Sequence, residues 1–178
     1  MSSADKTHLA DRNNNPANIK TSSDNWQGAD GSNAGFVKFS TPEHGVRAMA
    51  KNLYSYNDAG LTSVRAIMRK IVKVTDRQAY IDKVAADLGV DPDDDLGFLK
   101  DNPALTRKLI KSIAELEGAT TGPDGKFTDE VIMNGVKGAN GGEMVHAEQD
   151  TDHKAELYSS GMGDIKDTKW YEKHQSWK

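Results

Sequence analysis

The feature that most constrains the fold is a series of apolar stripes with helical spacing between about residues 42 and 136. Apolar residues that recur every three to four positions lie on one face of an α-helix. Five such segments follow one another, and most are bounded by a capping residue at the start and a glycine at the end. The sequence therefore predicts a mainly α fold, a compact bundle of about five helices.

Capping residues set the limits of these segments. Ser40 or Thr41 precedes Pro42 and caps the first helix, because Pro is favoured at the first helical position. The expected helices cover residues 41–60, 62–72, 75–89, 102–117 and 128–137. Ahead of them, Phe36–Phe39 alternates apolar with other residues and predicts a short strand or an extended strap. No partner strand is obvious, since Gly28–Gly35 looks like a turn cluster with three glycines.

The chain divides into three parts. Residues 1–11 are small and polar and are expected to be a flexible lead-in, and residues 12–138 form the helical domain. Residues 139–178 begin with a glycine-rich linker and show no sustained period, which predicts an extended C-terminal arm. Exposed aromatic side chains on such an arm usually anchor in a partner's pocket. The candidate docking residues are Trp170, Tyr171 and Trp177.

Composition excludes several classes of function. The net charge is −4 with both signs interspersed, which is not the basic footprint of a nucleic-acid binder. The absence of cysteine excludes disulfides and thiol catalysis, and the five dispersed histidines lack metal-site spacing, so we expect no metal and no cofactor. No apolar run reaches the roughly 18–20 residues that span a membrane. None follows Met1, so we expect no signal peptide.

One stretch fits neither helix nor strand, Arg12-Asn13-Asn14-Asn15-Pro16-Ala17-Asn18-Ile19, and Trp26-Gln27-Gly28 comes soon after it. Asn side chains build tight turns by bonding nearby backbone, and they also bond ligands. Two interpretations stay open: an ordered loop whose amides cap the helices, or the polar wall of a cleft. On the second, the candidate substrate-binding residues are Arg12, Asn13, Asn14, Asn15, Asn18 and Trp26.

Two carboxylates are candidates for acid–base chemistry. Glycan cleavage needs a carboxyl that stays protonated near neutral pH and donates its proton to the leaving oxygen. Glu43 lies at a helix start, where the helix dipole favours the ionised form. Glu117 and its neighbour Glu115 lie at a helix end, where the dipole favours the protonated form. Glu117 and Glu43 are therefore the candidate catalytic residues, and each also fits an ordinary surface or capping role.

The order of the motifs resembles a family of tailed-bacteriophage proteins. The Asn-rich stretch is followed by Gly35-Phe36-Val37-Lys38-Phe39, by Gly45-Val46-Arg47-Ala48 and later by Met133-Asn134-Gly135-Val136. Members of this family are virion structural proteins or lysozyme-like or transglycosylase-like peptidoglycan hydrolases. The likeness covers most of residues 12–138 and not the arm, and it implies a lysozyme-like arrangement as one form of the bundle.

The resemblance implies two alternative functions. In the first, the protein rides in the virion and opens peptidoglycan during genome delivery, with Glu117 or Glu43 as general acid. In the second, the domain is a non-catalytic component whose arm docks on tail, portal or core proteins of the virion. The sequence departs from the family at Ala17, where the family has Gly, and at Leu116, where it has His beside the retained Glu.

Overall fold

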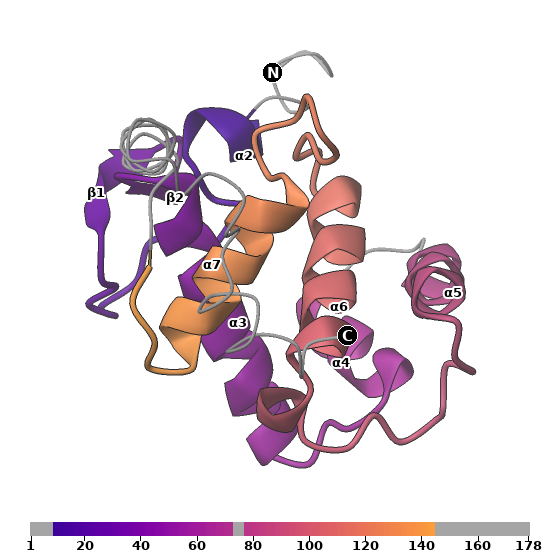
Figure 1. Ribbon diagram of the computed structural model, residues 1–178. Helices are drawn as coiled ribbons and strands as arrows, with labels where there is room; N and C mark the ends of the chain where they lie inside the picture. The colour runs from indigo at the N-terminus through magenta and orange to yellow at the C-terminus, as the bar shows by residue number, and fades with distance from the viewer. Residues whose placement is uncertain (1–8, 73–76, 145–178) are drawn as a thin grey trace, which may run out of the picture.

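The computed structural model describes residues 9–72 and 77–144, and all five expected helices are present in it (Figure 1). The mainly α prediction is therefore confirmed. The expected start of the third helix at Thr75 and the docking residues of the arm lie outside the described residues. The elements follow in the order α2 (Leu9–Arg12), β1 (Ala29–Asn33), β2 (Phe36–Phe39), α3 (Pro42–Asp58), α4 (Val64–Ile71), α5 (Arg77–Leu88), the 3-10 helix η1 (Leu99–Asp101), α6 (Pro103–Leu116) and α7 (Asp129–Ala139).

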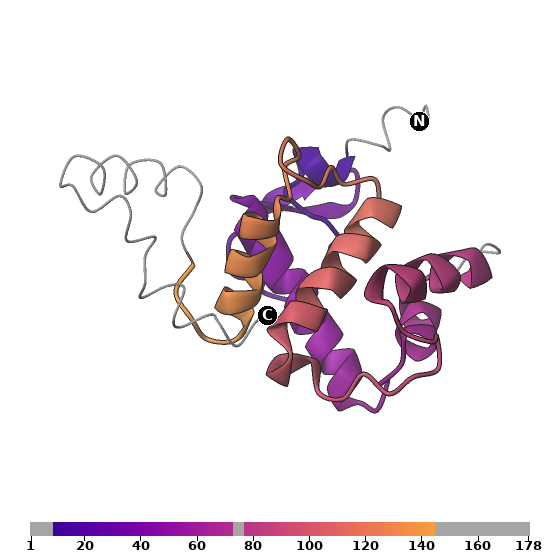
Figure 2. The same cartoon turned by 45° about the vertical axis from the view of Figure 1, so that its right-hand side comes forward.

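Helix α6 lies between two groups of helices, with α3 and α7 on one side and α4 and α5 on the other (Figure 2). The helices of the first group approach closely at Gly135 of α7, where an added Cβ would collide with the Val46 side chain of α3. The glycine at this position therefore sets how tightly the two helices pack. The predicted stripes form one core of fully buried side chains that includes Met49, Leu53, Ile67, Ile81, Leu109, Ile110 and Ile132.

The strand at Phe36–Phe39 has a partner that the sequence did not reveal. Strand β1 pairs with it in an antiparallel hairpin, and the two-residue loop Ala34-Gly35 has positive φ at both positions (54° and 81°). Positive φ at both loop residues is the geometry that suits a two-residue hairpin. All five residues of β1 are exposed, so no apolar alternation marks the strand in the sequence.

The other edge of β2 is held by the Asn-rich loop. Val37 N donates to Ile19 O at 2.9 Å, and Phe39 N donates to Asn13 O, also at 2.9 Å. Asn15 is completely buried, and its Nδ2 donates to the carbonyls of Ile19 (3.0 Å) and Val37 (2.8 Å), while its Oδ1 accepts from Ile19 N (2.9 Å). The loop therefore works as a third strand-like edge of the hairpin.

The loop also rests directly on helix α3. At Gly45 an added Cβ would collide with the carbonyl of Asn14, so only glycine allows this approach. The positive φ values of the loop fall on Asn14 (50°) and Asn18 (47°), and Ala17 does not share them. Asn tolerates this region better than other non-glycine residues. The alanine that replaces the family's glycine at residue 17 therefore causes no backbone strain of this kind.

The described domain starts before the expected boundary at residue 12. Leu9 and Ala10 belong to α2 and are buried, with 5% and 0% of their surface exposed. Their apolar side chains are the physical reason why residues 9–11 join the domain rather than the lead-in.

We predict that Asn15→Ala lowers the free energy of unfolding by about 2–3 kcal/mol, because one buried and two partly buried hydrogen bonds to the main chain are lost. Urea unfolding followed by circular dichroism measures the change. The matched control is Asn25→Ala, in an exposed position of the same N-terminal region, where we expect a change below about 0.5 kcal/mol. Equal stabilities of the two variants would contradict the anchoring role of Asn15.

Candidate functional site

Glu117 caps the C-terminus of α6. Its backbone N–H donates to the carbonyls of Ile113 and Ala114, both at 3.1 Å, and Gly118 follows with a φ of 86°. A glycine in the left-handed region directly after a helix reverses the chain and ends the helix. This local geometry leaves the Glu117 side chain partly buried at the end of the helix rather than pointing freely into solvent.

The side chain of Asn18 meets Glu117 although 99 positions separate them. Asn18 Nδ2 donates to the Glu117 carboxylate oxygen Oε2 at 3.0 Å and to the Glu117 backbone carbonyl at 3.2 Å. One amide group thus binds both the carboxylate and the helix end that carries it. The bond to Oε2 restricts the rotamers of the Glu117 side chain, and the bond to the backbone carbonyl fixes Asn18 against the helix end.

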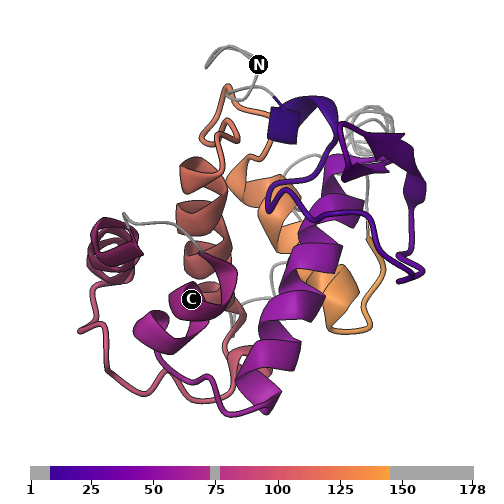
Figure 3. The ribbon, with the colours of Figure 1, turned by 180° about the vertical axis from the view of Figure 1, so that it is seen from behind.

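A second connection joins the same two segments. The Asp11 carboxylate accepts from the Thr120 backbone N–H at 2.9 Å and from the Thr120 hydroxyl at 2.6 Å. Figure 3 shows the consequence, with α2 beside the loop that leaves α6. The N-terminal segment and residues 117–120 are therefore held together by two independent sets of hydrogen bonds.

The environment of Glu117 favours its protonated form. Burial raises the pKa of the Glu117 carboxyl above its ordinary value, and the hydrogen bond from Asn18 partly opposes this shift. A carboxyl with a raised pKa keeps a proton closer to neutral pH, which is what a general acid needs. The environment of Glu117 therefore suits proton donation.

Glu43 lies in a different setting. It is in the first turn of α3 and only 1% exposed, and its backbone carbonyl lies against Gly135 of α7. A polymeric substrate cannot contact a carboxyl covered in this way without a movement of the surrounding chain. The geometry therefore favours Glu117 over Glu43 as the group that would meet a substrate.

The remaining predicted residues mostly face the hairpin. Asn13 Oδ1 accepts from Asn33 Nδ2 at 3.0 Å, and Asn14 Nδ2 donates to the Phe39 carbonyl at 2.9 Å. Trp26 packs against a small second cluster formed by Val37, Phe39 and Ala48, whereas Arg12 is exposed at the end of α2. Asn18 is thus the member of the predicted set that these hydrogen bonds bring to Glu117.

Neither a metal-binding group of side chains nor a membrane-spanning helix occurs in the described part of the chain. Within residues 9–72 and 77–144, no group of three or more His, Asp or Glu side chains is arranged to hold a metal ion. None of the helices in this part of the chain combines the length and the apolar character that crossing a bilayer requires.

We predict that the stability of the protein relative to Glu117→Gln declines as the pH rises. Because the pKa is raised, the folded chain binds a proton at Glu117 at a higher pH than the unfolded chain does. The free energy of unfolding therefore falls as the pH rises from the ordinary value of 4.5 through the raised value. Gln keeps the shape of the side chain but does not titrate.

Urea unfolding of both proteins at intervals from about pH 4 to pH 7 measures this difference. Asn18→Ala serves as the second variant, since loss of the opposing hydrogen bond should extend the decline to higher pH. Parallel stability curves for the protein and Glu117→Gln would contradict the perturbed titration of this carboxyl.

Part of this chain is similar in sequence to a bacteriophage protein. The chain is 38% identical over 87 residues to Protein P5 of Pseudoalteromonas phage PM2, a match that covers 44% of this chain and 54% of that protein. The chain thus spans about half the length of this curated relative. No protein-family model matches the chain. The similarity supports a phage-associated protein.

Proposed function

We propose that this chain is a virion-associated bacteriophage protein whose helical domain cleaves peptidoglycan during genome delivery, in the manner of a lysozyme or lytic transglycosylase. The observation that carries the proposal is the Glu117 carboxyl, which is partly buried, has a raised pKa and is held by Asn18 from a distant segment. The similarity to a phage protein supports the virion setting.

In the proposed reaction, Glu117 donates its proton to the glycosidic oxygen as the bond to the anomeric carbon breaks. Asn18 acts as a positioning residue, because it binds the carboxylate oxygen and the helix end together. Glu43 is covered, so the chemistry rests on one accessible member of the predicted pair. This arrangement favours a lytic transglycosylase, in which a hydroxyl of the sugar itself bonds to the anomeric carbon and gives its proton to the Glu117 carboxylate.

Substrate contacts in this proposal come from two predicted residues, Arg12 at the end of α2 and Trp26 beside the hairpin. Arg12 is exposed at the end of α2, one residue after Asp11, whose carboxylate binds Thr120. Trp26 is partly exposed, and a partly exposed indole ring can stack on a sugar. Asn13, Asn14 and Asn15 serve mainly to hold the hairpin, so they support the site through the fold.

We predict that the purified protein clears a suspension of peptidoglycan and that Glu117→Gln lowers the rate by about 10²–10⁴-fold, the usual contribution of a general acid. Turbidity measures the rate. Asp58→Asn is the matched control, since Asp58 is an exposed carboxylate at the end of α3, and Glu43→Gln tests the buried carboxyl. Absence of clearing by the unmodified protein at high concentration would exclude the catalytic proposal.

A second candidate is a non-catalytic virion component that docks on tail, portal or core proteins through its C-terminal arm. The observation in its favour is Leu116, which stands where the resembled family has His and packs against the core instead of offering a second polar group beside Glu117. The docking residues Trp170, Tyr171 and Trp177 lie outside the described residues.

We predict for this candidate that removal of residues 145–178 prevents incorporation into particles while the helical domain stays folded. The truncation spares residues 139–144, because Ala139 is buried in α7 and Gly142 N–H donates to the Lys137 carbonyl at 2.9 Å. Immunoblots of purified particles measure incorporation, and circular dichroism checks the fold. Normal incorporation of the truncated chain would count against a docking arm.

A further inference from the structure

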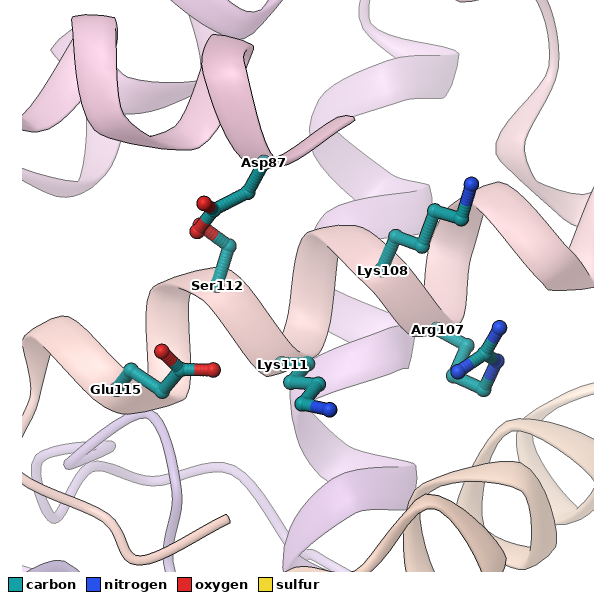
Figure 4. A pocket seen from close by; sticks show the side chains of 6 residues that line it. All are labelled: Asp87, Arg107, Lys108, Lys111, Ser112 and Glu115. Atoms are coloured by element: carbon teal, nitrogen blue, oxygen red, sulfur yellow. The ribbon is translucent and has the colours of Figure 1, made fainter. Parts of the chain in front are cut away.

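A groove with a volume of about 330 Å³ lies between α5 and α6, apart from the Glu117–Asn18 pair. Figure 4 shows the side chains along it, with Asp87 of α5 pointing toward Ser112 of α6. Its lining is polar or charged throughout and consists of Asp87, Arg107, Lys108, Lys111, Ser112 and Glu115.

One end of the groove carries an excess of positive charge. Arg107 and Lys111 share a single carboxylate oxygen, Asp129 Oδ1, at 3.3 and 3.4 Å. Lys108 is exposed and makes no ion pair with any residue in the described part of the chain. Two of these three cations share one carboxylate and the third pairs with none in the described part of the chain, so positive charge is in excess here, which suits an anionic group of a ligand.

The other end carries an excess of negative charge. Lys83 Nζ lies 2.8 Å from Asp87 Oδ2 and 3.3 Å from Glu115 Oε2, so one ammonium group serves two carboxylates. The buried Ser112 hydroxyl also donates to Asp87 at 2.6 Å. These hydrogen bonds from Lys83 and Ser112 hold the pKa of Asp87 below its ordinary value, so the carboxylate stays ionised at neutral pH.

From this polarity we infer that the groove binds a short peptide that carries a free carboxylate at one end and an ammonium group at the other. The carboxylate would lie at Arg107, Lys108 and Lys111, and the ammonium group would lie at Asp87 and Glu115. Arg107 and Glu115 are about 12 Å apart along α6. An extended peptide of about four residues spans that length.

The polarity distinguishes this ligand from other charged molecules. A uniformly anionic polymer would meet Asp87 and Glu115 at one end of the groove, and like charges in close contact are unfavourable. In intact peptidoglycan the first residue of each stem is amide-bonded to the sugar, so both end groups are free only in a released stem peptide. This source of the ligand rests on the proposed function. Binding is measured without cleavage, so the absence of one property would not imply the absence of the other.

The test uses the full chain and the synthetic tetrapeptide L-Ala-γ-D-Glu-L-Lys-D-Ala, titrated into the labelled protein and followed by amide chemical shifts. We expect saturable binding with shifts at Lys108, Lys111 and Ser112. Lys108→Gln should weaken the affinity by about 1.5- to fivefold, the range for one exposed ion pair. Amidation of the peptide's C-terminal carboxylate should weaken it by a similar factor.

The matched control is Lys38→Gln, which removes the same charge from an exposed position on β2, and its affinity should equal that of the native protein. Lys108 is exposed, so its replacement should leave the fold intact. The inference is overturned if the tetrapeptide shows no saturable binding at millimolar concentration or if Lys108→Gln binds as tightly as Lys38→Gln. Polyphosphate that binds more tightly than the peptide would also overturn it.

Discussion

Buried amide hydrogen bonds between the Asn-rich loop and the main chain are the constraint on which the N-terminal half of the domain depends. Asn15 satisfies three backbone groups of the loop and β2, and Asn14 rests its carbonyl on α3 where Gly45 leaves room. Buried backbone groups without a hydrogen-bond partner lower the free energy of unfolding. The Asn15 amide bonds the backbone groups that a neighbouring strand would otherwise bond. With the loop fixed in this way, Asn18 reaches the end of α6.

Helix α6 carries residues of both candidate sites, the Glu117 site and the groove between α5 and α6. Its apolar face is buried in the core, its polar face forms one wall of the groove at Ser112, and its C-terminal end carries Glu117. Glu115 and Glu117 are only two positions apart, yet Glu115 contacts Lys83 of α5 whereas Glu117 contacts Asn18. Residues two apart on a helix point to different sides, so one short segment serves both surfaces.

Several residues of the sequence motifs have a role in packing. Gly45 and Gly135 each stand where a Cβ would collide with the neighbouring segment, and Asn13 and Asn15 are completely buried. These residues keep the fold together whether or not the protein cleaves a glycan. Similarity to Protein P5 of phage PM2 is consistent with a shared origin.

The sequence by itself determined the five main helices and the two carboxylates to consider, because apolar periodicity and capping are local properties that neighbouring residues specify. It did not reveal β1, whose residues are all exposed, and it could not assign partners to the four asparagines. Only the tertiary structure showed that Asn18, and not the three asparagines before it, binds Glu117. Only the tertiary structure showed that Glu43 is buried. The physical reason is distance along the chain: hydrogen bonds across 99 and 109 positions, such as Asn18 to Glu117 and Thr120 to Asp11, leave no periodic trace in the sequence.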